Sequence, residues 1–281
     1  MRFKEKLLLA LEGSIPSKFF KYLPSGYSKI GDIAIVRLSK KLETYKHIIG
    51  SAILNIAKVN VVVNQKDTHG ELRKPEIELL AGERRTTTLH KEFNTIFHID
   101  IALITFSPGN KHERAKLIQI VKNQEQILDM FACIGNLSLP VAVNNETVNI
   151  TAIEKNPVAY KLLKLNIKAN SVEKRYEAVL GDNRTYTPHD CFDRVLMGGF
   201  NSDERQFEIA VKAICDEGWI HRHDIVLRNQ LSMTEDFIRK KSIELGFIIK
   251  NLATRIVKKY SPSKYHICTD LYIKKHDPIS L

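Results

Sequence analysis

The fold expected for this chain follows from residues 126–136, QILDMFACIGN. An apolar strand over Gln126–Met130 carries Asp129 near its end and runs into a turn of small residues, and a helix from Leu137 to Val143 follows. In an open α/β sheet the ligand lies beyond the carboxyl ends of the strands, and small residues there let it approach the backbone. The stretch therefore predicts both a sheet strand and one wall of a ligand site.

Strands and helices alternate from about residue 112 onward. This alternation predicts an α/β, doubly wound, mostly parallel Rossmann-like sheet. Further strands are expected at 149–154, 176–180, 192–197, 219–221, 247–252, 255–260 and 266–273, and helices at 157–169, 207–215 and 234–245. The last two strands should form an antiparallel edge.

Residues 1–105 have a different texture, because they mix helical segments with antiparallel-looking strands. The strands are expected at 33–38, 60–63, 77–82 and 95–99, and a helix at 41–57. The sequence thus predicts a smaller N-terminal α+β domain, 1–105, ahead of a cofactor-binding catalytic domain, 106–281.

The composition favours a cytoplasmic protein that meets a polyanion. The net charge is +11 and the sequence pI about 9.4, so nucleic acid is the first candidate partner, although a basic proteome would give the same excess. The four cysteines are far apart and form no CxxC pair, which predicts reduced thiols rather than a zinc site or disulfides. No apolar run reaches the roughly 18 residues that span a bilayer, so neither membrane insertion nor export is expected.

Carboxylates also follow the next two predicted strands. Glu154 ends its strand, where a carboxylate can accept both hydroxyls of a ribose. Asp182 and Asn183 follow the third strand, where their side chains could read an adenine amino group. Gly135 is the only glycine of the first turn, so a dinucleotide pyrophosphate is disfavoured. Together these points predict a nucleoside without phosphates, such as S-adenosylmethionine; singly, each is also compatible with a solvated strand end.

These residues resemble the archaeal and eukaryotic group that contains the tRNA guanine-37 N1-methyltransferases and the wyosine-pathway aminocarboxypropyltransferases. The resemblance runs from about Gly31 to Asp270 as short matches in one order. They are 30–34 (IGDIA), 70–73 (GELR), 89–92 (LHKE), 106–108 (FSP), 113–114 (ER), 129–132 (DMFA), 154–157 (EKNP), 181–184 (GDNR) and 193–198 (DRVLMG). The resemblance implies a class I methyltransferase fold, S-adenosylmethionine as donor, no metal, and tRNA as partner, with the N-terminal domain serving tRNA binding.

The matched motifs also imply site residues. Those expected at the cofactor are Ser107, Arg114, Asp129, Phe131, Gly135, Glu154, Lys155, Asp182 and Asn183. Ser107 and Arg114 would hold the donor's carboxylate, although an ordinary surface charge is the alternative for Arg114. Arg73 and Glu113 match catalytic positions of the methyltransferases. Cys133 stands where the group usually has glycine.

Gly198 separates the two activities of the group. The methyltransferases carry the asparagine of an Asn-Leu-Pro-type motif there, whereas the aminocarboxypropyltransferases have glycine. The resemblance therefore implies transfer of the 3-amino-3-carboxypropyl group to C7 of 4-demethylwyosine at position 37 of tRNA-Phe, in wybutosine-derivative biosynthesis, with release of methylthioadenosine. One alternative is methylation, either of guanine 37 at N1 or of a later wyosine intermediate, since Arg73 and Glu113 are present. The other is a catalytically silent RNA-binding protein, against which the retained Asp129, Glu154 and Asp182 argue.

Basic and histidine residues supply further candidates. One possible RNA groove comprises Arg255, Lys258, Lys259, Tyr260, Lys264 and Tyr265, with a solvated edge strand as the alternative; a second basic surface comprises Arg73, Arg84, Arg85 and Lys91. His221 and His223 share one face of a strand, but no third metal ligand lies at a suitable spacing from them in the sequence. We expect the anticodon region of tRNA-Phe as partner, and neither a metal, a membrane nor a protein partner.

Overall fold

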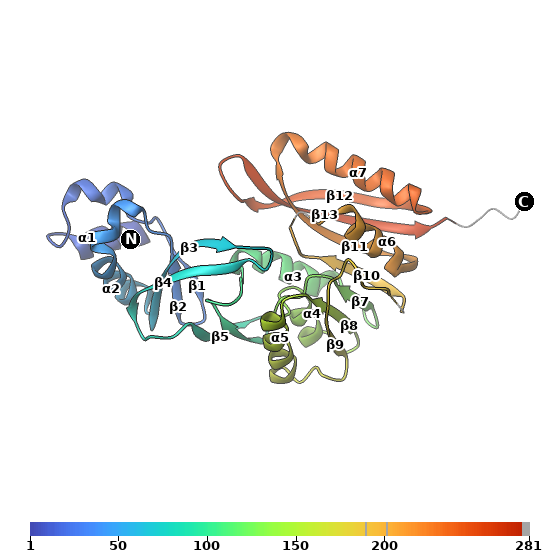
Figure 1. The fold of residues 1–281 in the computed structure, drawn as a ribbon, viewed down its shortest axis with the longest axis horizontal. Helices are drawn as coiled ribbons and strands as arrows, with labels where there is room; N and C mark the ends of the chain where they lie inside the picture. The colour runs from blue at the N-terminus through green and yellow to red at the C-terminus, as the bar shows by residue number, and fades with distance from the viewer. Residues whose placement is uncertain (189, 201, 277–281) are drawn as a thin grey trace, which may run out of the picture. The chain divides into compact units, whose positions relative to one another are not determined.

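A computed structural model describes residues 1–188, 190–200 and 202–276. The chain divides into two units (Figure 1). Unit 1 comprises Met1–Glu92 and Ile96–Pro108, and unit 2 comprises Phe93–Thr95 and the chain from Gly109. The last five residues of the predicted catalytic domain, 277–281, and positions 189 and 201 within it lie outside the described residues.

Unit 1 is built around a four-stranded sheet of order β1-β2-β3-β4, in which β2 and β3 are parallel and the other neighbours antiparallel. Its elements are α1 (Phe3–Leu11), η1 (Ser17–Tyr22), β1 (Ser28–Ile30), β2 (Ile33–Val36), η2 (Lys40–Tyr45), α2 (Lys46–Ala57), β3 (Val61–His69), β4 (Lys74–Gly82), β5 (Thr87–Glu92) and β6 (Thr95–Asp100). β5 and β6 form a separate two-stranded sheet. The apolar faces of α1 and α2 pack with the sheet in one core, which includes Leu7, Leu11, Ile53 and Val62.

The helix expected at 41–57 is wrong in its first turn. Residues Lys40–Tyr45 form the 3₁₀ helix η2, and the α-helix begins only at Lys46. Ser39 caps η2 by accepting a hydrogen bond from the Lys41 N–H, and this local bond favours the tighter turn over continuous α-helix.

Unit 2 contains a seven-stranded sheet of order β12-β13-β11-β10-β7-β8-β9. Its elements are η3 (Pro108–Asn110, which begins at the end of unit 1), α3 (Lys111–Ile120), β7 (Gln126–Asp129), α4 (Ser138–Asn144), β8 (Asn149–Glu154), α5 (Pro157–Ala169), β9 (Tyr176–Leu180), β10 (Phe192–Met197), α6 (Glu204–Ala213), β11 (Ile214–Leu227), η4 (Arg228–Gln230), α7 (Leu231–Glu244), β12 (Phe247–Lys259) and β13 (Lys264–Lys275). The five strands from β11 to β9 are parallel, while β13 pairs antiparallel with both β11 and β12. The predicted doubly wound sheet with an antiparallel edge is therefore confirmed.

The two faces of this sheet differ in polarity near its centre. Val195 and Ile220 point into an apolar core with Phe207 of α6 and Ile238 of α7. Because side chains alternate along a strand, Arg194 and His221 point to the opposite face, where they meet residues of α3. That face carries the polar network described below.

The two strands expected at 247–252 and 255–260 are one continuous strand, β12. Its pairing with β13 shifts register between Ile249 and Asn251 and again between Ile256 and Lys258. Each shift reverses which side chains face the core, so the apolar pattern looks interrupted although the strand is not.

The prediction that all four cysteines are free thiols is wrong for one pair. Cys191 and Cys215 form a disulfide, while Cys133 and Cys268 are free. Phe192 of β10 pairs in register with Ile214 of β11, so the two flanking cysteines come together with their Cα atoms 5.3 Å apart. Their separation of 24 residues in sequence hid this proximity.

Candidate cofactor and active site

Asp129, the last residue of β7, is buried with 1% of its surface exposed. Its Oδ1 accepts a hydrogen bond from the Phe131 N–H at 3.1 Å, and its Oδ2 accepts one from the Ser138 hydroxyl at 2.6 Å. Tyr176 then acts as donor to the Ser138 Oγ at 2.5 Å. Burial raises the pKa of Asp129 to about 6. Neutral donors therefore hold this carboxylate, and among the described residues it has no ion-pair partner.

The turn after β7 requires two residues in the left-handed region. Gly135 has φ +88°, and a Cβ there would lie 2.7 Å from the Cβ of Leu139. Cys133 has φ +53°, a conformation that glycine adopts more readily than cysteine. This explains why glycine is expected at position 133. Burial, with Glu154 nearby, raises the pKa of the Cys133 thiol, so it stays protonated and weakly nucleophilic.

Glu154 ends β8 and holds this turn. Its Oε2 accepts from the Cys133 N–H at 2.6 Å, and its Oε1 accepts from the Asn156 N–H at 2.7 Å. Burial raises the pKa of Glu154. Each carboxylate oxygen has a second lone pair, so Glu154 retains capacity to accept bonds from the two hydroxyls of a ribose.

Asp182 follows β9 and is held by two cations. Its Oδ1 accepts from the Arg184 backbone N–H and Nε, and its Oδ2 lies 3.0 Å from the Lys155 Nζ. The hydrogen bond from Arg184 is the main reason that the pKa of Asp182 lies well below its usual range. Lys155 and Asp182 are therefore brought together, as partners of each other.

Asn183 uses its amide group within the protein. Its Nδ2 donates to the Met130 carbonyl at 2.5 Å, and its Oδ1 accepts from the Gln206 Nε2 at 2.7 Å. The side chain is buried, with 7% exposure. Through these two bonds Asn183 ties the loop after β9 to the turn after β7 and to α6.

Gly198 and Gly199 follow β10 and make room for neighbouring side chains. A Cβ at Gly199 would overlap the ring of Phe131, and one at Gly198 would lie 2.9 Å from the Leu137 Cδ1. Phe131 is thereby packed against the end of β10, next to the turn that carries Cys133. No side chain extends from positions 198 and 199.

Asp129, Glu154 and Asp182 form what we call the acidic edge, because β7, β8 and β9 are parallel neighbours and end on the same side of the sheet. Carboxylates repel phosphates but accept hydrogen bonds from hydroxyl and amino groups, and they attract a sulfonium cation. The acidic edge thus fits a nucleoside with a positive charge, which is the chemistry of S-adenosylmethionine.

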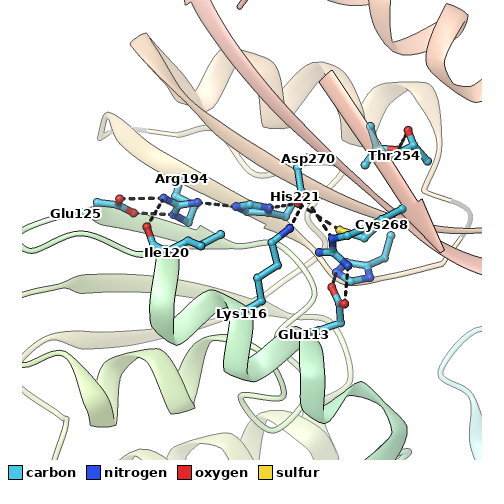
Figure 2. A network of polar contacts seen from close by, with 12 residues as sticks. Glu113, Lys116, Ile120, Glu125, Arg194, His221, Thr254, Cys268 and Asp270 are labelled. Carbon is cyan, nitrogen blue, oxygen red and sulfur yellow. Dashed lines mark hydrogen bonds and ion pairs between the residues drawn. The ribbon is translucent and has the colours of Figure 1, made fainter. Parts of the chain in front are cut away.

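A second group of charged side chains, the polar network, lies between α3 and the sheet (Figure 2). It comprises Glu125, Arg194, His221, Asp270, Lys116, Arg255 and Glu113. Arg194 binds Glu125 through two hydrogen bonds of 2.6 and 2.9 Å and donates to the His221 Nε2 at 2.6 Å. His221 must therefore carry its proton on Nδ1, which donates to Asp270 at 2.6 Å. Burial lowers the pKa of His221, in keeping with a neutral ring.

Asp270 and Glu113 complete the polar network through two cations. The Asp270 Oδ2 lies 2.5 Å from the Lys116 Nζ and 3.2 Å from the Arg255 Nε. The Arg255 Nη1 donates to the Glu113 Oε1 at 2.5 Å, and Glu113 itself is 5% exposed. Glu113, expected from its motif to be catalytic, is thus paired with a guanidinium inside the protein.

Potential metal ligands that sequence spacing did not reveal also meet here. Two sets, Glu113 with His223 and Cys268, and His221 with Cys268 and Asp270, have ligand atoms within 4.8 Å of one another. Strand pairing and α3 bring them together. Lys116 and Arg255 already neutralise both carboxylates, so the charge balance of the polar network does not call for a metal cation.

Histidines 223 and 266 form a buried pair, with His223 Nδ1 2.8 Å from His266 Nε2. Burial lowers the pKa of both rings to about 3, so both are neutral. The ring of Phe200 meets His266 edge-on at 4.8 Å between centroids.

The remaining expected site residues are distributed over the two units. Arg73 and Ser107 belong to unit 1, and the Arg73 carbonyl accepts a hydrogen bond from the Thr105 hydroxyl at 3.0 Å. Arg114 belongs to unit 2 and is 1% exposed, so it is not the ordinary surface charge considered as its alternative.

Some residues of the two basic surfaces expected from the sequence make contacts within the protein. Arg255 belongs to the polar network, and Lys258 donates to Asn110 at 2.8 Å. Arg85 pairs with Asp32 and Glu83. Lys259, Lys264 and the other remaining basic members are exposed.

The chain matches two family models, which lie one after the other along residues 7–246. The TRM5/TYW2 methyltransferase domain matches residues 88–246, and the TYW2 N-terminal domain matches residues 7–86. The tRNA(Phe) (4-demethylwyosine(37)-C(7)) aminocarboxypropyltransferase of Pyrococcus horikoshii is 36% identical, over 97% of this chain and 98% of that protein. The tRNA (guanine(37)-N(1))-methyltransferase Trm5b of Pyrococcus abyssi is 30% identical, over 92% of this chain and 78% of that protein.

Solved structures give the same grouping. The crystal structure of P. horikoshii TYW2 in complex with MeSAdo has a TM-score of 0.80 and 32% identity, and the match covers 97% of this chain and 100% of that one. The complex of aTrm5 and tRNALeu has a TM-score of 0.80 and 29% identity, with 97% and 79% covered. Within the described residues, no helix combines the length and apolar character needed to cross a membrane. The sequence matches, the shared fold and the acidic edge agree that the chain belongs to the TRM5/TYW2 methyltransferase family.

Proposed function

We propose that this protein transfers the 3-amino-3-carboxypropyl group of S-adenosylmethionine to C7 of 4-demethylwyosine in tRNA-Phe, with release of methylthioadenosine. The relatives named for this activity support the proposal, since that of P. horikoshii aligns over 97% of this chain and that of Methanocaldococcus jannaschii over 87%. The TYW2 N-terminal domain matched by residues 7–86 supports the same assignment.

When bound, S-adenosylmethionine supplies a sulfonium with three electrophilic carbons, so the group transferred depends on which carbon faces the nucleophile. Attack by C7 of the base on the γ-carbon forms a carbon–carbon bond and breaks the bond from that carbon to sulfur. The electron pair passes to sulfur, and C7 then loses its proton. In this proposal Glu154 accepts the ribose hydroxyls, Asp182 lies toward the adenine, and Asp129 favours the positive charge of the donor.

The observation that carries the choice of reaction is the end of β10. Gly198 and Gly199 place no side chain there, and the Phe131 ring packs against Gly199. A methyl transfer to guanine N1 gains from a group that holds or deprotonates the base, because N1 carries a proton. C7 loses its proton only after it has attacked the γ-carbon, so this reaction needs no strong base before the new bond forms. Glu113, the other candidate for that task, is paired with Arg255. We therefore treat Glu113 as a positioning residue.

The substrate part of the proposal is tRNA, and its anticodon region at position 37 is the expected target. Ser107 and Arg114 are proposed to hold the carboxylate of the donor, because a planar guanidinium pairs well with a carboxylate. A cytoplasmic location and action without a protein partner complete the proposal, in keeping with a reaction that needs only tRNA and a diffusible donor.

The test uses tRNA-Phe that carries 4-demethylwyosine and two forms of the donor, one labelled in the methyl group and one in the carboxyl carbon. Carboxyl label in the tRNA, together with released methylthioadenosine, is the expected result. Methyl label in the tRNA would overturn the proposal in favour of the methyltransferases. If neither label enters the tRNA while calorimetry shows that the donor binds, the proposed substrate is overturned.

A further inference from the structure

Unit 1 has a segment rich in positive charge, and its residues belong to neither the acidic edge nor the polar network. Residues 13–42 contain six basic residues and a single acidic residue, Asp32. The basic residues are Lys18, Lys21, Lys29, Arg37, Lys40 and Lys41, and all six are exposed. This segment therefore contributes a large share of the net positive charge of the chain.

The single acidic residue does not neutralise these lysines. Asp32 accepts hydrogen bonds from Arg85, including one at 3.1 Å, and from the Thr88 hydroxyl at 2.7 Å. The bond from Arg85 is the main reason that the pKa of Asp32 falls to about 2. Within the residues that the structure describes, none of the six basic side chains of the segment forms an ion pair.

Four of the lysines lie on two short 3₁₀ helices together with aromatic rings. We call this set the lysine–aromatic patch: Lys18, Phe19, Lys21 and Tyr22 of η1, and Lys40 and Lys41 of η2. Both η1 and η2 belong to unit 1, and the two helices contact each other. The phenol of Tyr22 joins them, because Lys41 donates to its oxygen at 3.0 Å.

The ammonium groups lie over the rings. Lys18 is 5.3 Å from the centroid of Phe19, Lys21 is 5.2 Å from that of Tyr22, and Lys41 is 4.5 Å from that of Tyr22. The ammonium groups of Lys21 in η1 and Lys41 in η2 therefore both lie over the ring of Tyr22. A cation over an aromatic ring keeps much of its charge available to an anion, and the ring limits its motion. The arrangement suits an anion that can bridge two ammonium groups.

We infer that the lysine–aromatic patch binds backbone phosphates of the tRNA substrate. The inference rests on the proposed function, and it adds a contact surface of unit 1. A phosphate backbone supplies closely spaced anions, and proteins that bind it combine lysines with aromatic side chains. The two basic surfaces expected from sequence are weaker candidates, because Arg85 and Arg255 are committed to carboxylates within the protein.

The test compares two triple variants of the full chain. Lys18→Gln with Lys21→Gln and Lys41→Gln removes three charges of the patch. Lys161→Gln with Lys164→Gln and Lys168→Gln removes three exposed charges of α5 in unit 2 and serves as the matched control. Affinity for tRNA-Phe is measured by fluorescence at several salt concentrations, and thermal unfolding confirms that both variants fold.

We expect the patch variant to bind tRNA about tenfold more weakly near 0.1 M salt, and its plot of log affinity against log salt to be less steep by about 2, since each lost phosphate contact removes about 0.7–0.9 from the slope. The control should stay within about twofold of the unchanged protein. Equal losses in both variants, or no loss in the patch variant, would overturn the inference.

Label transfer separates this inference from the proposed function. The patch variant should raise the KM for tRNA and leave kcat unchanged, because a contact to backbone phosphates is the same in the ground state and in the transition state. If the unchanged protein transfers no carboxyl label but the patch variant still loses tRNA affinity, the reaction is wrong and the patch stands. If transfer occurs and the patch variant keeps full tRNA affinity, the reaction stands and the patch is wrong.

Discussion

Unit 2 has two regions rich in charge, and they hold their carboxylates in different ways. At the acidic edge, Asp129 and Glu154 accept hydrogen bonds from backbone N–H groups and a serine hydroxyl. In the polar network, Glu125, Asp270 and Glu113 each face an arginine or lysine. A carboxylate held by neutral donors keeps its charge for a ligand, whereas a carboxylate paired with a cation joins elements of the fold. Asp182 is intermediate, since Lys155 and Arg184 hold it at the edge of the site.

The largest expected effect comes from breaking the polar network at Arg194. The change Arg194→Met leaves Glu125 buried without its guanidinium partner and should lower the free energy of unfolding by about 3–5 kcal/mol. Urea denaturation measures this loss. Combining it with Glu125→Leu should recover most of the stability, because no unpaired charge remains. If the single variant loses less than about 1 kcal/mol of unfolding free energy, the pair of Arg194 and Glu125 does not stabilise the fold to the extent expected.

Glu113→Gln tests whether Glu113 serves the fold as the partner of a cation or acts on the substrate. As a partner of Arg255 it should cost about 2 kcal/mol of unfolding free energy, the scale of a hydrogen bond to a charged group. The rate of label transfer, measured well below the melting temperature, should change by less than about threefold. A fall of about 100-fold in kcat with unchanged stability would instead make Glu113 a group that contacts the reacting base.

The pH dependence of donor binding tests the acidic edge. Burial raises the pKa of Asp129 from 3.8 to about 6, so its contribution to native stability declines as the pH rises through that interval. Donor binding that needs the charged carboxylate should be flat above pH 6 and weaken about tenfold per pH unit below it. Glu154, whose pKa burial also raises, adds to the same trend. Calorimetry between pH 5 and 8 measures this profile, and Asp129→Asn should flatten the steeper part.

The smallest expected effect concerns the turn after β7, which Glu154 of the acidic edge holds. In the unchanged protein the left-handed conformation of Cys133 costs about 1–2 kcal/mol, and Cys133→Gly relieves this strain. Glycine is more flexible in the unfolded chain, and this opposes part of the gain. The free energy of unfolding should rise by about 0.5 kcal/mol in urea denaturation, and donor affinity should stay within about threefold. A loss of stability would mean that packing of the half-buried thiol outweighs the backbone strain.

Much of unit 2 follows from local pattern. Alternating apolar runs and helical spacing predict the strands from 126 to 197 because each is set by a few neighbouring residues. The rule that strand ends share one edge then places Asp129, Glu154 and Asp182 together, as the pairing of β7, β8 and β9 shows. The internal hydrogen bond of Asn183 could not be foreseen, because its partner Gln206 lies 23 residues away in the sequence.

Short motifs and local periodicity were sufficient to predict the class of fold, the family and the order of acidic residues at the strand ends. The pairing of charged side chains and of cysteines became visible only in the folded chain. Arg194 meets His221, Arg255 meets Glu113, and Cys191 meets Cys215 because strand register and the packing of α3 bring distant residues within bonding distance. Pairing depends on side-chain geometry across the sheet, which a one-dimensional pattern does not contain.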